Sequence, residues 1–170
     1  MTRLKSDPPD HLRLHDDYHP EIHHEPKLIR GLSQLGVAAY VGGSCRELGA
    51  ASFLQAFFST VSAHLEPSGW GTRFPALMCQ LHKGKLSKSQ VELARRELFL
   101  VQSELKHFPP SAVIWDIANR SIRPPWGDNI APDISSLSLY FVTSEGDDLF
   151  DVLFATMDEA LRMQFDVVLE

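Results

Sequence analysis

The segment SKSQVELARRELFLVQSELKHFPP, residues 87–110, carries the clearest helical pattern in the chain. Its apolar residues recur at spacings of three and four, as on a helix with one buried face. These residues are Val91, Ala94, Leu98, Val101, Leu105 and Phe108. Ser87 and Gln90 form a predicted capping box at its start, and Pro109–Pro110 ends it. Such a helix needs other elements to cover its apolar face.

Three more helices are predicted around this one. The first covers residues 52–65, with Ser52 as its cap and a broad apolar stripe. The second is shorter and runs over residues 72–84. The third follows Gly146 and carries apolar residues on one face from Leu149 to Leu161.

Short strands are predicted between the helices. They cover residues 37–41, before Gly42–Gly43, and then residues 112–117 (AVIWDI), 136–143 and 165–169. For 136–143 an alternative is a short helix capped by Asp133. Proline, tryptophan and glycine make residues 118–132 a long loop. We therefore expect an α/β fold, with α+β as the alternative, in a single compact domain with a small sheet and three to four helices.

The N-terminal residues differ in composition from the rest of the chain. Residues 1–34 are rich in proline and histidine, and we expect them to form a mobile polar extension, with the domain at residues 35–170. Five histidines recur there near helical spacing: His11, His15, His19, His23 and His24. On a helix they would line one metal-binding edge, but Pro20 interrupts the run. We expect an incidental histidine-rich tail and no structural metal.

Composition excludes several classes of function. The 170 residues hold 16 Lys and Arg against 22 Asp and Glu, for a net charge of −6, which argues against nucleic acid as a partner. No apolar run is long enough to span a membrane, and the N-terminus lacks a signal-peptide core, so we expect no membrane association. The two cysteines have no paired spacing, and a cytoplasmic location is expected.

Charge is unevenly distributed along the chain. Residues 124–170 hold ten acids and one base, Arg162, whereas residues 73–123 hold nine bases and four acids. The acidic end would set up a local negative field if it folded onto one side of the domain. Alternatively, the basic middle segment packs beside the acidic end and neutralises it.

Four acids gather at the start of the last predicted helix: Glu145, Asp147, Asp148 and Asp151. Acids are favoured at a helix N-terminus, so some of them stabilise the helix. Four acids exceed what capping requires, and their spacing does not match a calcium-binding EF-hand loop. A surface for a basic partner is the functional interpretation.

Two Trp-Gly turns stand out, at residues 70–73 (WGTR) and 126–129 (WGDN). One interpretation is that both tryptophans anchor loops on the core. The other is that the turns present Arg73, Asp128 and Asn129 at a recognition surface.

Catalytic constellations have weak support. Cys45, in a strand-to-helix loop, could act as a nucleophile with His64 or His82 as base and Asp116 as orienting acid. Cys79 is expected to be a small buried hydrophobe within a helix. The glycines match neither GxGxxG nor a P-loop, so we expect no cofactor.

Three segments together resemble the Immunity protein 70 family of bacterial polymorphic toxin systems. They contain GWGTRFP at residues 69–75, PPWGDNI at 124–130, and YFVTS-G-DLF within 140–150. The resemblance runs from about Gly36 to about Asp166 and leaves out residues 1–34. A departure lies after IWDI, where this chain has Ala118-Asn119-Arg120.

The resemblance implies a non-enzymatic inhibitor. Its partner would be the C-terminal domain of a cognate polymorphic or contact-dependent growth inhibition toxin, a nuclease with a basic surface, bound in a stoichiometric complex. From charge and exposure alone, we assign the contacts to the acids and one aromatic anchor: Trp126, Asp128, Glu145, Asp147, Asp148 and Asp151. The alternatives are a small Cys/His/Asp enzyme and a general protein-interaction domain.

Overall fold

A tight turn at Gly42–Gly43 connects the first two strands, which form an antiparallel hairpin. Strand β1 (Gly36–Val41) pairs antiparallel with β2 (Ser44–Ala50), and Gly42 adopts a left-handed φ of +57°. The computed structural model describes residues 36–170, so the predicted extension and its histidine run lie outside the described residues. The strand predicted at 37–41 is confirmed. Strand β2 was missed because its charged residues hide the apolar alternation of a strand.

Two short strands complete an antiparallel sheet of order β2-β1-β4-β3. Strand β4 (Val167–Leu169) pairs with β1, and β3 (Lys85–Leu86) pairs with β4. The strand predicted at 165–169 is therefore confirmed, whereas β3 was not predicted. With its helices, the sheet forms a mixed α/β single domain, as expected.

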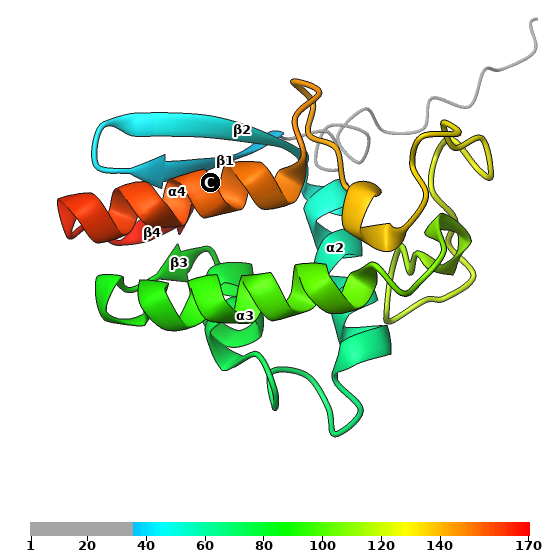
Figure 1. Cartoon of the computed structure of the whole chain (residues 1–170), viewed down its shortest axis with the longest axis horizontal. Helices are drawn as coiled ribbons and strands as arrows, with labels where there is room; N and C mark the ends of the chain where they lie inside the picture. The colour runs from blue at the N-terminus through cyan, green and yellow to red at the C-terminus, as the bar shows by residue number, and fades with distance from the viewer. Residues whose placement is uncertain (1–35) are drawn as a thin grey trace, which may run out of the picture.

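Three long helices pack with this sheet: α2 (Ala51–Leu65), α3 (Val91–Leu105) and α4 (Leu149–Met163). Helices α3 and α4 run side by side, and α2 crosses them at a steep angle (Figure 1). Each buries the face predicted from its apolar spacing. Within residues 36–170, none of the helices has the length and hydropathy of a membrane span.

The predicted helix starts were less accurate than the helices themselves. Helix α2 begins at Ala51, two residues before the start that the expected Ser52 cap would give, and no side chain caps it. A 3₁₀ turn, η3 (Lys88–Gln90), precedes α3, so the predicted capping box does not form. The helix predicted at 72–84 is shorter, with a π-helical turn η1 (Ala76–Gln80) and a 3₁₀ turn η2 (Leu81–Lys83).

The strand predicted at residues 112–117 is wrong. A 3₁₀ turn, η4 (Pro110–Ala112), is followed by irregular backbone. Two hydroxyl groups on α2 bind this backbone: Thr60 Oγ1 accepts from Ile114 N at 3.0 Å, and Ser59 Oγ accepts from Ile117 N at 3.1 Å. The polar groups that a neighbouring strand would have bound are therefore satisfied by side chains.

The strand predicted at residues 136–143 is also wrong. The segment forms a 3₁₀ turn, η5 (Leu137–Leu139), which begins after Ser136 and not at the Asp133 cap of the alternative prediction. Leu137 and Phe141 are buried while Leu139 is exposed, so the three residues do not share one face as a strand would require. The long loop at 118–132 is confirmed.

Two buried glutamates hold the segment between α2 and α3. Glu66 accepts hydrogen bonds from the backbone N–H groups of Gly71, Arg73 and Phe74. Glu97, on α3, accepts from Ala76 at 3.2 Å and from Leu77 at 2.9 Å, and burial raises the pKa of Glu97. A buried carboxylate is tolerated when its oxygens are bound in this way.

Trp70 and Gly71 belong to this packed segment. The Trp70 indole donates to Met78 O at 2.8 Å, and Gly71 has a φ of +70°. A Cβ atom at Gly71 would overlap Sγ of Cys79, which lies half-buried in η1. Arg73 forms an ion pair with Glu104 on α3. The first Trp-Gly turn is therefore a structural anchor.

Gly71→Ala tests this packing. Gly127→Ala is the matched control, because Gly127 has a φ of +61° and open space where a Cβ would lie. Both variants carry the left-handed strain of about 1 kcal/mol. Gly71→Ala should lose about 1–3 kcal/mol more because of crowding, as measured by urea denaturation. Cys79→Ala should restore most of that extra loss in the double variant, and equal losses in the two single variants would contradict the packing.

Candidate functional site

Residues 142–148, here called the acidic loop, form a small rigid turn before α4. Val142 and Asp148 form an isolated β-bridge, Thr143 N donates to Asp147 O at 2.8 Å, and Gly146 N donates to Thr143 O at 3.0 Å. The loop therefore presents Glu145 at its tip on a backbone that hydrogen bonds hold in place. A backbone held in this way loses little freedom when a partner binds.

Asp148 differs from the other acids of the loop. Its Oδ1 accepts a hydrogen bond from Phe150 N at 2.7 Å, which makes it the N-cap of α4. Burial raises the pKa of the Asp148 carboxyl, and the nearby charge of Asp151 raises it further. Of the acids predicted as contacts, Asp148 is therefore the one with a clear structural role.

A hollow of about 580 Å³ opens beside the acidic loop. It lies between β2, the loop and the first turns of α4. Its lining consists of Cys45, Arg46, Glu47, Glu145, Asp147, Asp148, Asp151, Val152 and Ala155. The structure thus gathers four of the predicted contacts and adds Glu47, which the sequence did not single out. We call this feature the acidic hollow.

Ion pairs divide the acids of the C-terminal end into two groups. The acids in the second half of α4 and after it are neutralised by bases from β2, β3 and α3. These pairs are Asp158 with Arg95 and Glu159 with Arg46, both at 2.6 Å, and Asp166 with Lys85 at 3.1 Å. Within the described part of the chain, Glu145, Asp147 and Asp151 form no ion pair. The basic middle segment therefore supplies partners for Asp158 and Asp166, whereas Arg46, which lines the acidic hollow, is neutralised by Glu159.

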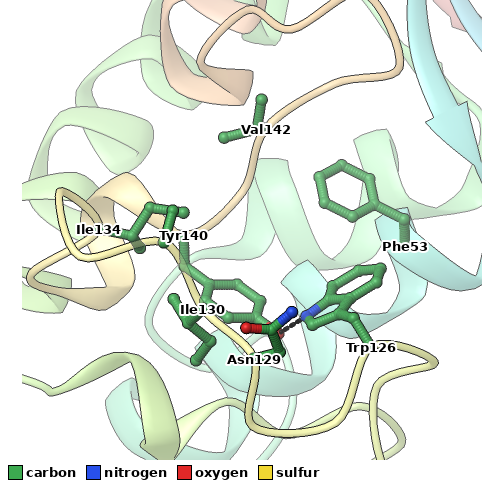
Figure 2. A pocket seen from close by; sticks show the side chains of 8 residues that line it. Phe53, Trp126, Asn129, Ile130, Ile134, Tyr140 and Val142 are labelled. Atoms are coloured by element: carbon green, nitrogen blue, oxygen red, sulfur yellow. Dashed lines mark hydrogen bonds between the residues drawn. The ribbon is translucent and has the colours of Figure 1, made fainter.

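Trp126 lines a second, smaller hollow of about 230 Å³ (Figure 2). The Trp126 indole donates to the Tyr140 hydroxyl at 3.0 Å and meets Trp115 edge to face at 5.1 Å between ring centroids. These contacts fix the ring, yet 44% of Trp126 remains exposed. The other lining residues are Phe53, Asn129, Ile130, Ala131, Ile134, Tyr140 and Val142. We call this feature the apolar hollow.

The acidic loop borders both hollows. Val142 at its start lines the apolar hollow and is 41% exposed, while Glu145 at its tip lines the acidic hollow. The second Trp-Gly turn thus presents its tryptophan on the surface, unlike the first. Asp128 is exposed beside this tryptophan but lines neither hollow, whereas its neighbour Asn129 lines the apolar one.

The predicted catalytic residues bind separate partners. Cys45 is exposed on strand β2 and not in the loop expected for it. His64 Nε2 lies 2.7 Å from Ala112 O, and Asp116 Oδ1 accepts from Ala118 N within its own turn. His82 contacts Gln55, and burial lowers the pKa of its imidazole. Between residues 36 and 170, no hydrogen bond joins these residues into a triad.

Metal ligation has no support in the described residues. No group of three or more His, Cys, Asp or Glu side chains between residues 36 and 170 is placed to hold a metal ion. The acids of the acidic hollow are therefore best described as separate surface charges. A group of surface acids beside an apolar, partly exposed ring is typical of a site that binds another protein.

Substitutions of Asp148 separate the contribution of its capping hydrogen bond to stability from that of its charge. Asp148→Ala should lose about 1 kcal/mol of stability because α4 loses its cap. Asp148→Asn keeps an accepting oxygen and removes a partly buried charge, so it should match or exceed the wild type at pH 7. The stability advantage of Asp148→Asn over the wild type should disappear at a pH below the pKa of the Asp148 carboxyl. The raised pKa means that the fold disfavours the charged carboxylate, and this cost is absent once the carboxyl is protonated.

Urea denaturation at two pH values measures these differences. Asp147→Ala is the control, because the Asp147 carboxylate is exposed and makes no hydrogen bond within residues 36–170. Its stability should change by less than about 0.5 kcal/mol. Equal losses for Asp148→Ala and Asp148→Asn would contradict the capping role.

Comparison with known proteins gives one match. A family model described as Immunity protein 70 matches residues 35–169. No curated protein and no solved structure matches the chain. Because the match covers most of the chain, the chain belongs to the Immunity protein 70 family.

Proposed function

We propose that this member of the Immunity protein 70 family binds the C-terminal domain of a cognate polymorphic or contact-dependent growth inhibition toxin and neutralises it in a stoichiometric complex. The family name supports an immunity role, which is non-enzymatic and depends on a toxin protein as partner. We further propose that the toxin is a nuclease and that the complex forms in the cytoplasm. The nuclease assignment rests on the acidic charge of the candidate site, and the cytoplasmic location rests on two cysteines that form no disulfide with each other.

The observation that carries this proposal is the group of acids on and beside the acidic loop that form no ion pair within residues 36–170. Glu145 and Asp147 are exposed, and Asp151 extends the group onto α4. A nuclease binds nucleic acid through basic residues, and an inhibitor that presents fixed negative charges competes for the same surface. Complementary charges also raise the association rate at low salt.

The apolar hollow supplies the second part of the proposed interface. Trp126 is held by Tyr140 and Trp115 but keeps an exposed face. Binding hot spots are often aromatic side chains that need little reordering when a partner covers them. We assign Trp126 the role of anchor and the acidic loop that of orienting the toxin.

Calorimetric titration with the toxin domain tests this interface. The proposal requires a gene for a large toxin beside the gene for this chain, and the C-terminal domain of that toxin, carrying a substitution that removes toxicity, is the ligand to use. The variant Glu145→Gln/Asp147→Asn/Asp151→Asn should bind on the order of 100-fold more weakly at low salt, at about 1 kcal/mol for each lost charge. Its affinity should also depend less steeply on salt than that of the wild type.

The matched control removes three charges elsewhere. Glu92→Gln/Glu104→Gln/Asp158→Asn changes the net charge equally, but its acids already form surface ion pairs. Such pairs contribute little to stability, so the control should fold and bind within about threefold of the wild type. Equal affinity of the two triple variants would contradict the assignment of the acidic loop.

A further inference from the structure

Among the described residues, strand β2 leaves one edge of the sheet open. The sheet order places β2 at one end, and within residues 36–170 β1 is its only strand partner. At seven residues, β2 is also the longest strand described. The unpaired edge of a strand can bind an extended segment of another chain through backbone hydrogen bonds.

The hairpin register identifies which backbone groups face outward. Because a two-residue loop joins β1 and β2, the closing pair Val41–Ser44 exchanges hydrogen bonds across the hairpin. Alternation along an antiparallel pair then directs the N–H and C=O groups of Cys45 and Glu47 away from β1. The N–H of Arg46, between them, points toward β1.

The acidic hollow lies along this same edge. Cys45, Arg46 and Glu47 form one side of it, and Asp151, Val152 and Ala155 of α4 form the other. A strand added to β2 would therefore occupy the hollow. Side chains of such a strand would alternate between the two faces of the sheet, so those on the α4 face would lie toward Asp151 and those on the other face toward Glu47.

We propose that the toxin domain contributes an extended basic segment, which pairs with the open edge of β2 as a fifth strand. Its lysine or arginine side chains would lie against Glu47, Glu145 and Asp151. This inference rests on the proposed function. It specifies that the toxin binds at the edge of β2 and that the binding segment of the toxin is an extended strand.

Charge favours this occupant over a second copy of the chain. Two copies paired through β2 would bring two acidic hollows together, and like charges across neighbouring strands destabilise a sheet. The segment at residues 1–34 holds six acids and five bases, so it offers little net positive charge for the hollow. A basic segment of the partner would bind the free N–H and C=O groups of β2 through its backbone and the acids through its side chains.

Amide hydrogen exchange of the full chain, followed by NMR, tests the proposal. In the free protein, the amides of Cys45 and Glu47 should exchange fast and that of Arg46 slowly. On addition of the non-toxic toxin domain, exchange at Cys45 and Glu47 should slow at least tenfold.

Three other outcomes would each be decisive. A complex that leaves the Cys45 and Glu47 amides fast would overturn strand addition while leaving the proposed function intact. Slow exchange of both amides in the free protein would overturn it as well, because residues 1–35 or a second copy would already cover the edge. Absence of any complex would overturn the proposed function, and strand addition with it.

A backbone variant gives an independent measurement. Cys45→Pro removes the outward N–H at a position where an edge strand tolerates proline, and Cys45→Val keeps this N–H. Cys45→Pro should bind the toxin domain at least tenfold more weakly than Cys45→Val. Equal affinity of the two variants would overturn the proposal, and if Cys45→Pro did not fold, the exchange experiment would decide alone.

Discussion

A single buried ring on α2, Phe57, holds both ends of the acidic loop. It meets Phe141, just before the loop, edge to face at 5.3 Å between ring centroids, and Phe150, just after it, at 5.6 Å. All three rings are fully buried. Because aromatic packing holds both flanks and hydrogen bonds close the turn between them, the backbone of the loop is tied to the core at both ends. The proposed binding site is therefore built directly on the centre of the domain.

The two Trp-Gly turns show how similar local sequences serve different ends. Near Trp70, the buried Glu66 accepts hydrogen bonds from three backbone N–H groups of the turn, and Arg73 of the turn pairs with Glu104 on α3. Near Trp126 no carboxylate of residues 36–170 does this, and the indole instead donates a hydrogen bond to Tyr140 near the surface. The difference lies in the residues that surround each turn in space. One turn thus stabilises the domain, and the other contributes to the candidate interface.

Sequence patterns predicted the elements that depend on their own periodicity. Helices α3 and α4 and strand β4 were found because their apolar spacing is regular. The strand expected at 112–117 failed because hydroxyls on α2 bind its backbone, and β2 was missed because Arg46 and Glu47 interrupt its apolar pattern. The acids of the candidate site were visible in the sequence. Which of them remain unpaired was not, because ion pairs join residues far apart in the chain.

The central claim is that the chain protects a cell by binding one toxin domain. Co-expression measures this most directly: the C-terminal domain of the neighbouring toxin gene is produced in bacteria with and without the full chain, and growth is followed. The account predicts arrest with the toxin domain alone, restored growth with the wild-type chain, and weaker protection when Glu145, Asp147 and Asp151 are neutralised. Growth arrest that the wild-type chain does not relieve would contradict it.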